Sequence, residues 1–241
     1  TNMTQVADVA AAVLAHLQES GWINSRLFSD ALDYCHDLLL DAGYSFSILD
    51  EVDRLLTHPC VMMVAGCQDR QLLRARVEAA YATIKRLNRP FRVVFSGLNP
   101  EAARAPTPVR TVNEAREMQA YFFALRDRDP DGAKLEVEPL PKLDQAATNT
   151  IANIKNFLTP SYLISPQSDV FVVSSTFHLV RLARQLEERL QGDASLPVHQ
   201  LFLIGAESNF TTPAVPTPSR YLKSMMNDLF TDALTRRTDR G

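Results

Sequence analysis

Five short apolar segments alternate with four amphipathic segments through the middle of the chain. The apolar segments cover residues 61–66, 91–97, 134–139, 169–175 and 198–205, and the amphipathic ones cover 74–87, 112–125, 148–158 and 178–190. Short apolar runs fit buried strands, whereas apolar residues spaced three and four apart fit one face of a helix. Strands that alternate with helices form a parallel sheet covered on both faces. We therefore predict a three-layer α/β fold whose five mainly parallel strands have the order 3-2-1-4-5, by analogy with half of a dinucleotide-binding fold.

The segments on either side of this alternation have helical patterns. Before residue 58 the patterns run over about 3–19, 25–40 and 46–56, and another helical pattern lies near the end of the chain. We expect residues 1–58 to form a helical extension packed on the core, and residues 59–241 to form the α/β domain with its C-terminal helix. The extension is either part of a signalling device or a surface for homodimer formation.

Charge and cysteine content exclude several classes of protein. The net charge is -3 with dispersed Lys and Arg, which predicts no nucleic-acid partner. No apolar run approaches the ~18 residues of a membrane span, and the start of the chain lacks the features of a secretory signal. The three cysteines, Cys35, Cys60 and Cys67, have no metal-ligand spacing, and the five histidines are dispersed, so we predict no metal. A cytoplasmic location is expected.

The segment DVFVVSSTFHLVR, residues 169–181, is the first candidate for a binding site. It predicts a strand that leads directly into a helix, and ligands of α/β proteins bind at the carboxyl ends of the strands. Backbone N–H groups at a helix N-terminus bind anions. Ser174, Ser175 and Thr176 are therefore candidate anion ligands, with His178 for proton exchange and Arg181 as an anion clamp.

The ends of the other strands supply further candidates. Glu114 falls on the inward face of its predicted helix, where an unpaired carboxylate is costly, so it meets either a ligand or an arginine such as Arg70 or Arg76. The remaining candidate ligand-binding residues are Gly66, Asp69, Arg70, Ser96, Gly97, Asn113, Asn149, Thr150 and Asn153. A solvent-facing stripe of Asn149, Asn153 and Asn156, with Thr148 as the N-cap, is expected on the helix at 148–158. The loops 98–111 and 206–219 follow strands and are expected to overhang the site.

Four motifs taken in order resemble a known family of bacterial proteins. They are Ser96-Gly97, Asn113-Glu114-Ala115, Ala147 to Thr150 followed by Asn153, and Ser174 to His178 followed by Arg181. Over about residues 60–205 the chain resembles the YdcF, SanA and ElyC family, also known as domain of unknown function 218, and its layout is closest to the soluble YdcF-like members. The resemblance implies a Rossmann-like fold and a nucleotide-type pocket, with S-adenosylmethionine as the suggested ligand.

Two functions follow as hypotheses. The first is an enzyme that acts on a nucleotide-like or phosphorylated small molecule, as an S-adenosylmethionine-dependent transferase or a phosphate-ester hydrolase. Glu114 would hold or deprotonate the ligand, and His178 would exchange a proton. The second is a non-catalytic sensor of the same ligand, linked to cell-envelope metabolism.

Overall fold

The structure, a computed structural model, describes residues 49–67, 70–99, 113–138 and 142–206. Within these ranges the side chains of residues 49–51, 176, 177, 180, 181, 183 and 184 are not described. The predicted helices before residue 49, the C-terminal helix, Asp69 and nearly all of both long loops therefore lie outside the described residues. Segments Ser47–Ser175 and Gln185–Asn209 form one compact unit, while Thr176–Arg184 belongs to a second unit.

Five strands form one parallel sheet in the order β3-β2-β1-β4-β5, which confirms the predicted fold class and strand order. The strands are β1 (Cys60–Ala65), β2 (Phe91–Ser96), β3 (Lys142–Asp144), β4 (Ser168–Ser174) and β5 (Val198–Gly205). The helices are α3 (Leu49–Leu55), α4 (Arg70–Leu87), α6 (Glu114–Arg128), α7 (Thr150–Phe157) and α8 (Thr176–Gly192), with a short 3-10 helix, η1, at Gly132–Lys134. Among the described helices, none is long and apolar enough to cross a bilayer.

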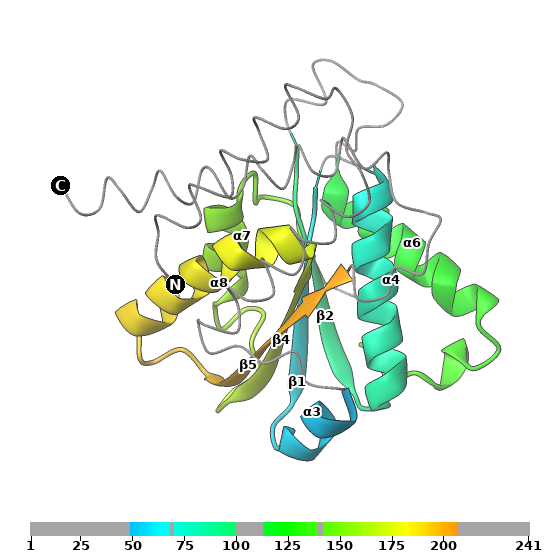
Figure 1. Cartoon of the computed structure of the whole chain (residues 1–241), viewed down its shortest axis with the longest axis horizontal. Coiled ribbons are helices and arrows are strands. Elements are labelled where there is room, and N and C mark those ends of the chain that lie inside the picture. The colour runs from blue at the N-terminus through cyan, green and yellow to red at the C-terminus, as the bar shows by residue number, and fades with distance from the viewer. Residues whose placement is uncertain (1–48, 68–69, 100–112, 139–141, 207–241) are drawn as a thin grey trace, which may run out of the picture. The chain divides into compact units, whose positions relative to one another are not determined.

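The helices cover both faces of the sheet. α4 and α6 pack against one face, and α7 lies on the other (Figure 1). β1 and β4 are fully buried along their lengths, as expected for central strands of a parallel sheet. The largest buried side chains are Phe91, Phe95, Phe122, Phe157, Phe171, Met62, Met63, Leu73, Ile84 and Met118. Each such side chain contributes about 1.5–3 kcal/mol of burial free energy, so the core positions the strand ends firmly.

The third strand differs from its predicted bounds. Among the described residues of the expected segment 134–139, only Val137 forms a parallel bridge, to Phe91 at the start of β2, and β3 itself begins at Lys142. Pro139 and Pro141 lie between these two points, and proline has no N–H to donate to a sheet ladder. The third strand of the sheet therefore lies after the predicted segment, while Val137 makes a separate short pairing with β2.

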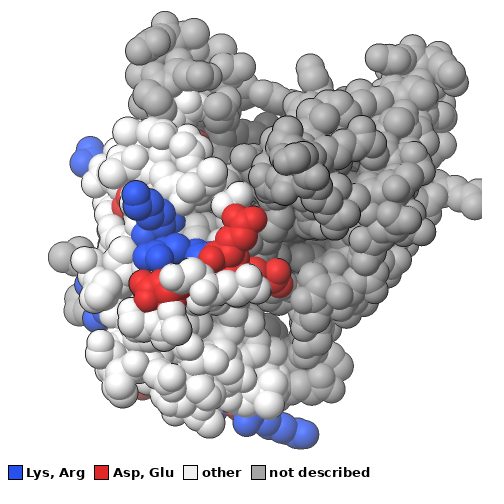
Figure 2. All heavy atoms as spheres, turned by 90° about the vertical axis from the view of Figure 1, so that its left-hand side faces the viewer, with Lys and Arg blue, Asp and Glu red and all other residues white. Residues whose placement is uncertain are grey.

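The surface over α7 and the C-terminal half of α8 carries charges of both signs. Figure 2 shows basic and acidic side chains next to one another on this face. Arg189 and Asp193 form an ion pair of 3.7 Å there, and Lys155 and Glu188 line the same shallow pocket. Nucleic-acid-binding surfaces typically carry a continuous stripe of Lys and Arg. The mixed charges on this face do not form such a stripe.

Candidate functional site at the carboxyl ends of the strands

β1 and β2 end side by side, and each is followed by glycine. Ala65 pairs with Ser96, and the Gly66 amide donates a 2.8 Å hydrogen bond to the Ser96 carbonyl. A Cβ on Gly66 would lie 2.6 Å from Oε2 and 2.7 Å from Cβ of Glu114. Gly97 has φ +150°, and a Cβ there would collide with the same carboxylate oxygen. Both positions therefore require glycine because the Glu114 side chain lies directly against the two strand ends.

Glu114 is held there by the start of α6. The Ala115 amide donates to the Gly97 carbonyl at 3.0 Å, and Asn113 caps the helix by accepting a 3.0 Å hydrogen bond from the Arg116 amide. The Glu114 residue is only 7% exposed, which confirms the prediction that it faces inward. Asn113 therefore contributes to the site as a helix cap, and its side-chain amide also donates to Gln145.

The environment of Glu114 favours its neutral form. Burial raises the pKa of this carboxyl from 4.5 to about 7, although the nearby Arg76 guanidinium acts in the opposite direction. The described residues give the carboxylate no hydrogen bond and no ion pair. A carboxyl group that changes charge near pH 7 can accept or donate a proton during a reaction, which is the property needed of a general acid or base.

Arg76 is a buried cation that connects the ends of β1 and β4. It is 2% exposed, and its Nη1 donates to the carbonyls of Ala65 at 2.9 Å and Gly66 at 3.0 Å. Its Nε donates to Oγ of Ser175 at 3.0 Å. The sequence predicted that the ends of the first and fourth strands share one place, and these contacts confirm it for Gly66 and Ser175.

The fourth strand ends in Ser174, and Ser175 follows it at the same edge. Ser175 is the N-cap of α8, but its side chain makes no capping hydrogen bond, and its Oγ accepts from Arg76 instead. Ser174 is fully buried, and its Oγ has no hydrogen-bond partner among the described residues. A buried hydroxyl without a partner is uncommon in folded proteins, so Ser174 is a group that a ligand or an ordered water would satisfy.

A second polar cluster lies behind Glu114, between β2, β3 and α7. Ser96 Oγ contacts Asp144 Oδ2 at 2.8 Å and Asn153 Oδ1 at 2.9 Å, and Asn156 Nδ2 lies 3.2 Å from Asp144 Oδ1. The Ala146 amide also donates to Asp144 at 3.1 Å. These contacts connect β2, β3 and α7, so the members of the cluster hold the strand ends in place.

The expectation that the stripe of asparagines faces solvent is confirmed for Asn149, which is exposed, and is wrong for Asn153 and Asn156. Asn153 is buried against Ser96, Asn156 contacts Asp144, and Ile151 of the predicted apolar stripe is 55% exposed. The buried Asp144 carboxylate holds the side of α7 that carries the Asn153 and Asn156 side chains toward the sheet. Thr148 is not the N-cap, because Asn149 accepts the capping hydrogen bond from Ala152 at 2.9 Å, while Thr150 is buried in the first turn.

The remaining predicted site residues are Arg70, at the start of α4, and three residues at the start of α8. Arg70 forms a 2.7 Å ion pair with Glu117, so it is Arg76 that faces Glu114. Thr176, His178 and Arg181 lie in the first turns of α8, in the segment that belongs to the second unit, and His178 is half-buried. Their participation in a site with Glu114 stays a prediction.

The sequence did not single out Asp144 or assign Arg76 a binding role. Arg76 was recognised only as a partner of Glu114, although its position among the apolar residues of α4 is a signal for a buried, functional cation. Asp144 lies in a strand of three residues whose position the apolar pattern does not give.

Comparison with known proteins yields no relative. No family model, no curated protein and no solved structure matches the chain. The resemblance to the YdcF, SanA and ElyC family therefore stays an expectation, and the function rests on the residues themselves.

Proposed function

We propose that the protein is an enzyme that binds a nucleotide-like or phosphorylated small molecule at the carboxyl ends of β1, β2 and β4. The observation that carries this proposal is the buried Glu114 carboxylate, which has a pKa of about 7 and no hydrogen bond to a described residue. A protein gains no stability from such a group, because a buried charge without hydrogen bonds is costly. Perturbed carboxylates of this kind concentrate at functional sites.

The surroundings of Glu114 favour a ligand with hydroxyl or amino groups and a separate anionic group. Hydroxyl or amino hydrogens of a ligand would satisfy the carboxylate, and the unpartnered Ser174 Oγ supplies another polar contact on β4. The anionic group is proposed to bind at the N-terminus of the helix that follows Ser175, with Thr176 and Arg181 as its ligands. His178 is then the second proton-exchanging residue.

S-adenosylmethionine fits this chemistry as a candidate ligand. Its ribose hydroxyls and amino group are donors to a carboxylate, and its sulfonium and ammonium charges would favour ionised Glu114. The family resemblance suggests the same ligand. The reaction would be group transfer from this cofactor, or hydrolysis of a phosphate ester when the ligand is phosphorylated.

Thermal unfolding of the purified chain with a panel of ligands tests the proposal. The panel holds S-adenosylmethionine, its demethylated product, nucleotides and sugar phosphates. A ligand at ~100 times its dissociation constant stabilises the native state by about 2.7 kcal/mol. We expect one class to raise the Tm of wild type and to lose this effect in Glu114→Gln.

A matched variant controls for changes of charge on the same helix. Glu117→Gln removes another carboxylate from α6, one that is paired with Arg70 at 2.7 Å. It should keep the full ligand effect. No stabilisation by any member of the panel, or equal stabilisation of wild type and Glu114→Gln, would contradict the proposal. Ligand binding without turnover would instead support the sensor.

A further inference from the structure

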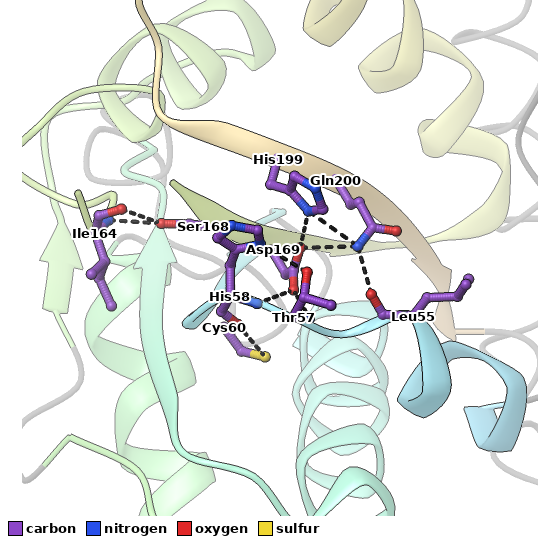
Figure 3. Close-up of polar contacts among 9 residues, drawn as sticks. All are labelled: Leu55, Thr57, His58, Cys60, Ile164, Ser168, Asp169, His199 and Gln200. Carbon is purple, nitrogen blue, oxygen red and sulfur yellow. Dashed lines mark hydrogen bonds and ion pairs between the residues drawn. The ribbon is translucent and has the colours of Figure 1, made fainter. Parts of the chain in front are cut away.

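Two histidines and an aspartate meet at the opposite end of the sheet, where the strands begin. His58 precedes β1, Asp169 is the second residue of β4, and His199 is the second residue of β5. Figure 3 shows the three side chains directed toward one another. One nitrogen or carboxylate oxygen from each lies within 4.8 Å of the other two. The interpretation of the histidines as dispersed is therefore wrong for His58 and His199.

An irregularity in the sheet brings His199 to the carboxylate. Ser168 pairs with Val198 but Asp169 pairs with Gln200, so His199 is the extra residue of a bulge. In a regular strand His199 and Gln200 would point to opposite faces, yet His199 Nδ1 and Gln200 Nε2 both contact Asp169 Oδ1, at 3.1 and 3.2 Å. Bulges redirect side chains in this way and are frequent beside functional sites.

The two oxygens of Asp169 have different partners. Oδ2 accepts hydrogen bonds from the backbone amides of Thr57 and His58, both at 2.9 Å, and so fixes the chain before β1. Among the described residues, Oδ1 makes hydrogen bonds only with the His199 and Gln200 side chains, and Gln200 Nε2 also donates to the Leu55 carbonyl at 2.8 Å. If a cation displaced Gln200 from Oδ1, the Gln200 side chain would still have the Leu55 carbonyl as an acceptor. Oδ1 is therefore the oxygen of Asp169 that is available to coordinate a cation.

The imidazole rings are arranged to share one ion. The centroids of the His58 and His199 rings are 4.0 Å apart, with an interplanar angle of 39°. An imidazole ring binds a metal ion through the lone pair of one of its nitrogens. Ligand atoms of a tetrahedral zinc site with 2.0 Å bonds lie about 3.3 Å apart. Small movements of the three side chains would bring their ligand atoms to this spacing.

A cavity of about 510 Å³ gives access to the cluster through His58. Its lining also includes Cys60, Arg89 and Arg92. Both arginines are engaged, Arg89 with Asp53 and Arg92 with Glu138, each at 2.7 Å. Cys60 Sγ lies 3.8 Å from the His58 carbonyl oxygen, and it is not one of the three clustered side chains.

We propose that His58, Asp169 and His199 bind a divalent transition-metal ion such as Zn²⁺. Two imidazole nitrogens and the Oδ1 of Asp169 are the ligands, and the remaining position is open to water or to a small ligand in the cavity. Imidazole and carboxylate ligands suit Zn²⁺ and its first-row neighbours, and three protein ligands are typical of sites that keep an open position.

Zinc titration of the full chain, freed of metal with a chelator, tests this site. The affinity is measured by competition with a chromogenic chelator near pH 7.5, and circular dichroism checks that each variant is folded. Wild type should bind one ion, and the affinities of His58→Gln and His199→Gln for it should be at least about tenfold weaker. Cobalt bound at the same site should show the visible absorption of a tetrahedral ion, and the same two variants should lose it.

Two control variants define the ligand set. Cys60→Ser removes the thiol that lines the cavity, and His178→Gln removes a histidine that is outside the cluster. Both should bind zinc as wild type does. The proposal is overturned if wild type binds no zinc, if folded His199→Gln binds it with unchanged affinity, or if Cys60→Ser is the variant that loses it.

Discussion

Arg76 on α4 donates a 3.0 Å hydrogen bond from its Nε to Oγ of Ser175, the residue that follows β4. The same guanidinium donates to the carbonyls of Ala65 and Gly66 at the end of β1. β1 and β4 are neighbours in the sheet, and the other strands follow outward from this pair, with β2 and β3 on one side and β5 on the other. Ligands of open α/β sheets bind at such a point. A single buried cation therefore connects both sides of the proposed binding edge.

Replacement of Arg76 should destabilise the fold. Arg76→Met keeps much of the volume but leaves two carbonyls and a serine hydroxyl without their donor, and the expected loss is about 3 kcal/mol of unfolding free energy. Urea denaturation measures it. Arg74→Met is the control, because Arg74 is exposed on the same helix and lies over the Tyr121 ring. Equal losses in the two variants would show that the contacts of Arg76 contribute little.

The pH dependence of stability should reveal Glu114. Its pKa is raised from 4.5 to about 7 in the folded chain, so the folded state binds more protons than the unfolded state between these values. The contribution of Glu114 to stability is therefore greatest below pH 4.5, and it falls as the pH rises to 7, by up to about 3 kcal/mol.

Comparison with Glu114→Gln isolates this effect. The variant cannot ionise at this position, so its stability should exceed that of wild type increasingly from pH 5 to pH 8, as measured by denaturant unfolding at each pH. A constant difference across this range would mean that Glu114 titrates near its ordinary value.

The parts of this molecule that were predictable from sequence are those set by periodicity. The alternation of apolar and amphipathic segments gives the parallel sheet, its order and the inward direction of Glu114. The bounds of β3 and the buried side of α7 were wrong, because they depend on the prolines at 139 and 141 and on Asp144, whose burial only tertiary packing creates. His58, Asp169 and His199 could not be grouped from the sequence, since their meeting requires the strand register and the bulge at His199.

Gly97 should be the least replaceable of the described glycines at the strand ends. Gly97→Ala combines a φ of +150° with a collision against the Glu114 side chain, whose Cβ would lie 3.1 Å away, and should cost at least ~2 kcal/mol. Gly192→Ala is the matched control, because nothing lies within 4 Å of a Cβ at the end of α8. It should change stability by less than ~1 kcal/mol. Thermal unfolding of both variants measures the difference. A Gly97→Ala variant as stable as wild type would contradict the close approach of Glu114 to Gly97.

Asp169 should stabilise the fold most at neutral pH. Burial acts to raise the pKa of this carboxyl, but hydrogen bonds from the His58 amide, the His199 ring, the Thr57 amide and Gln200 outweigh burial and lower it. A lowered pKa means that the stabilisation is present above the unfolded value of about 4 and is lost as the pH falls below it.

Asp169→Asn tests this contribution directly. An asparagine has one acceptor oxygen in place of two, so either the amides of Thr57 and His58 or the side chains of His199 and Gln200 lose their acceptor. We expect a loss of about 1–3 kcal/mol at pH 7 that shrinks below pH 4, measured by urea unfolding. Asp193→Asn is the control, because Asp193 contacts the exposed Ser195 near the end of α8 and should change stability little. A loss from Asp169→Asn that stays the same at pH 3 and pH 7 would show that the charge of Asp169 is not the source of its effect.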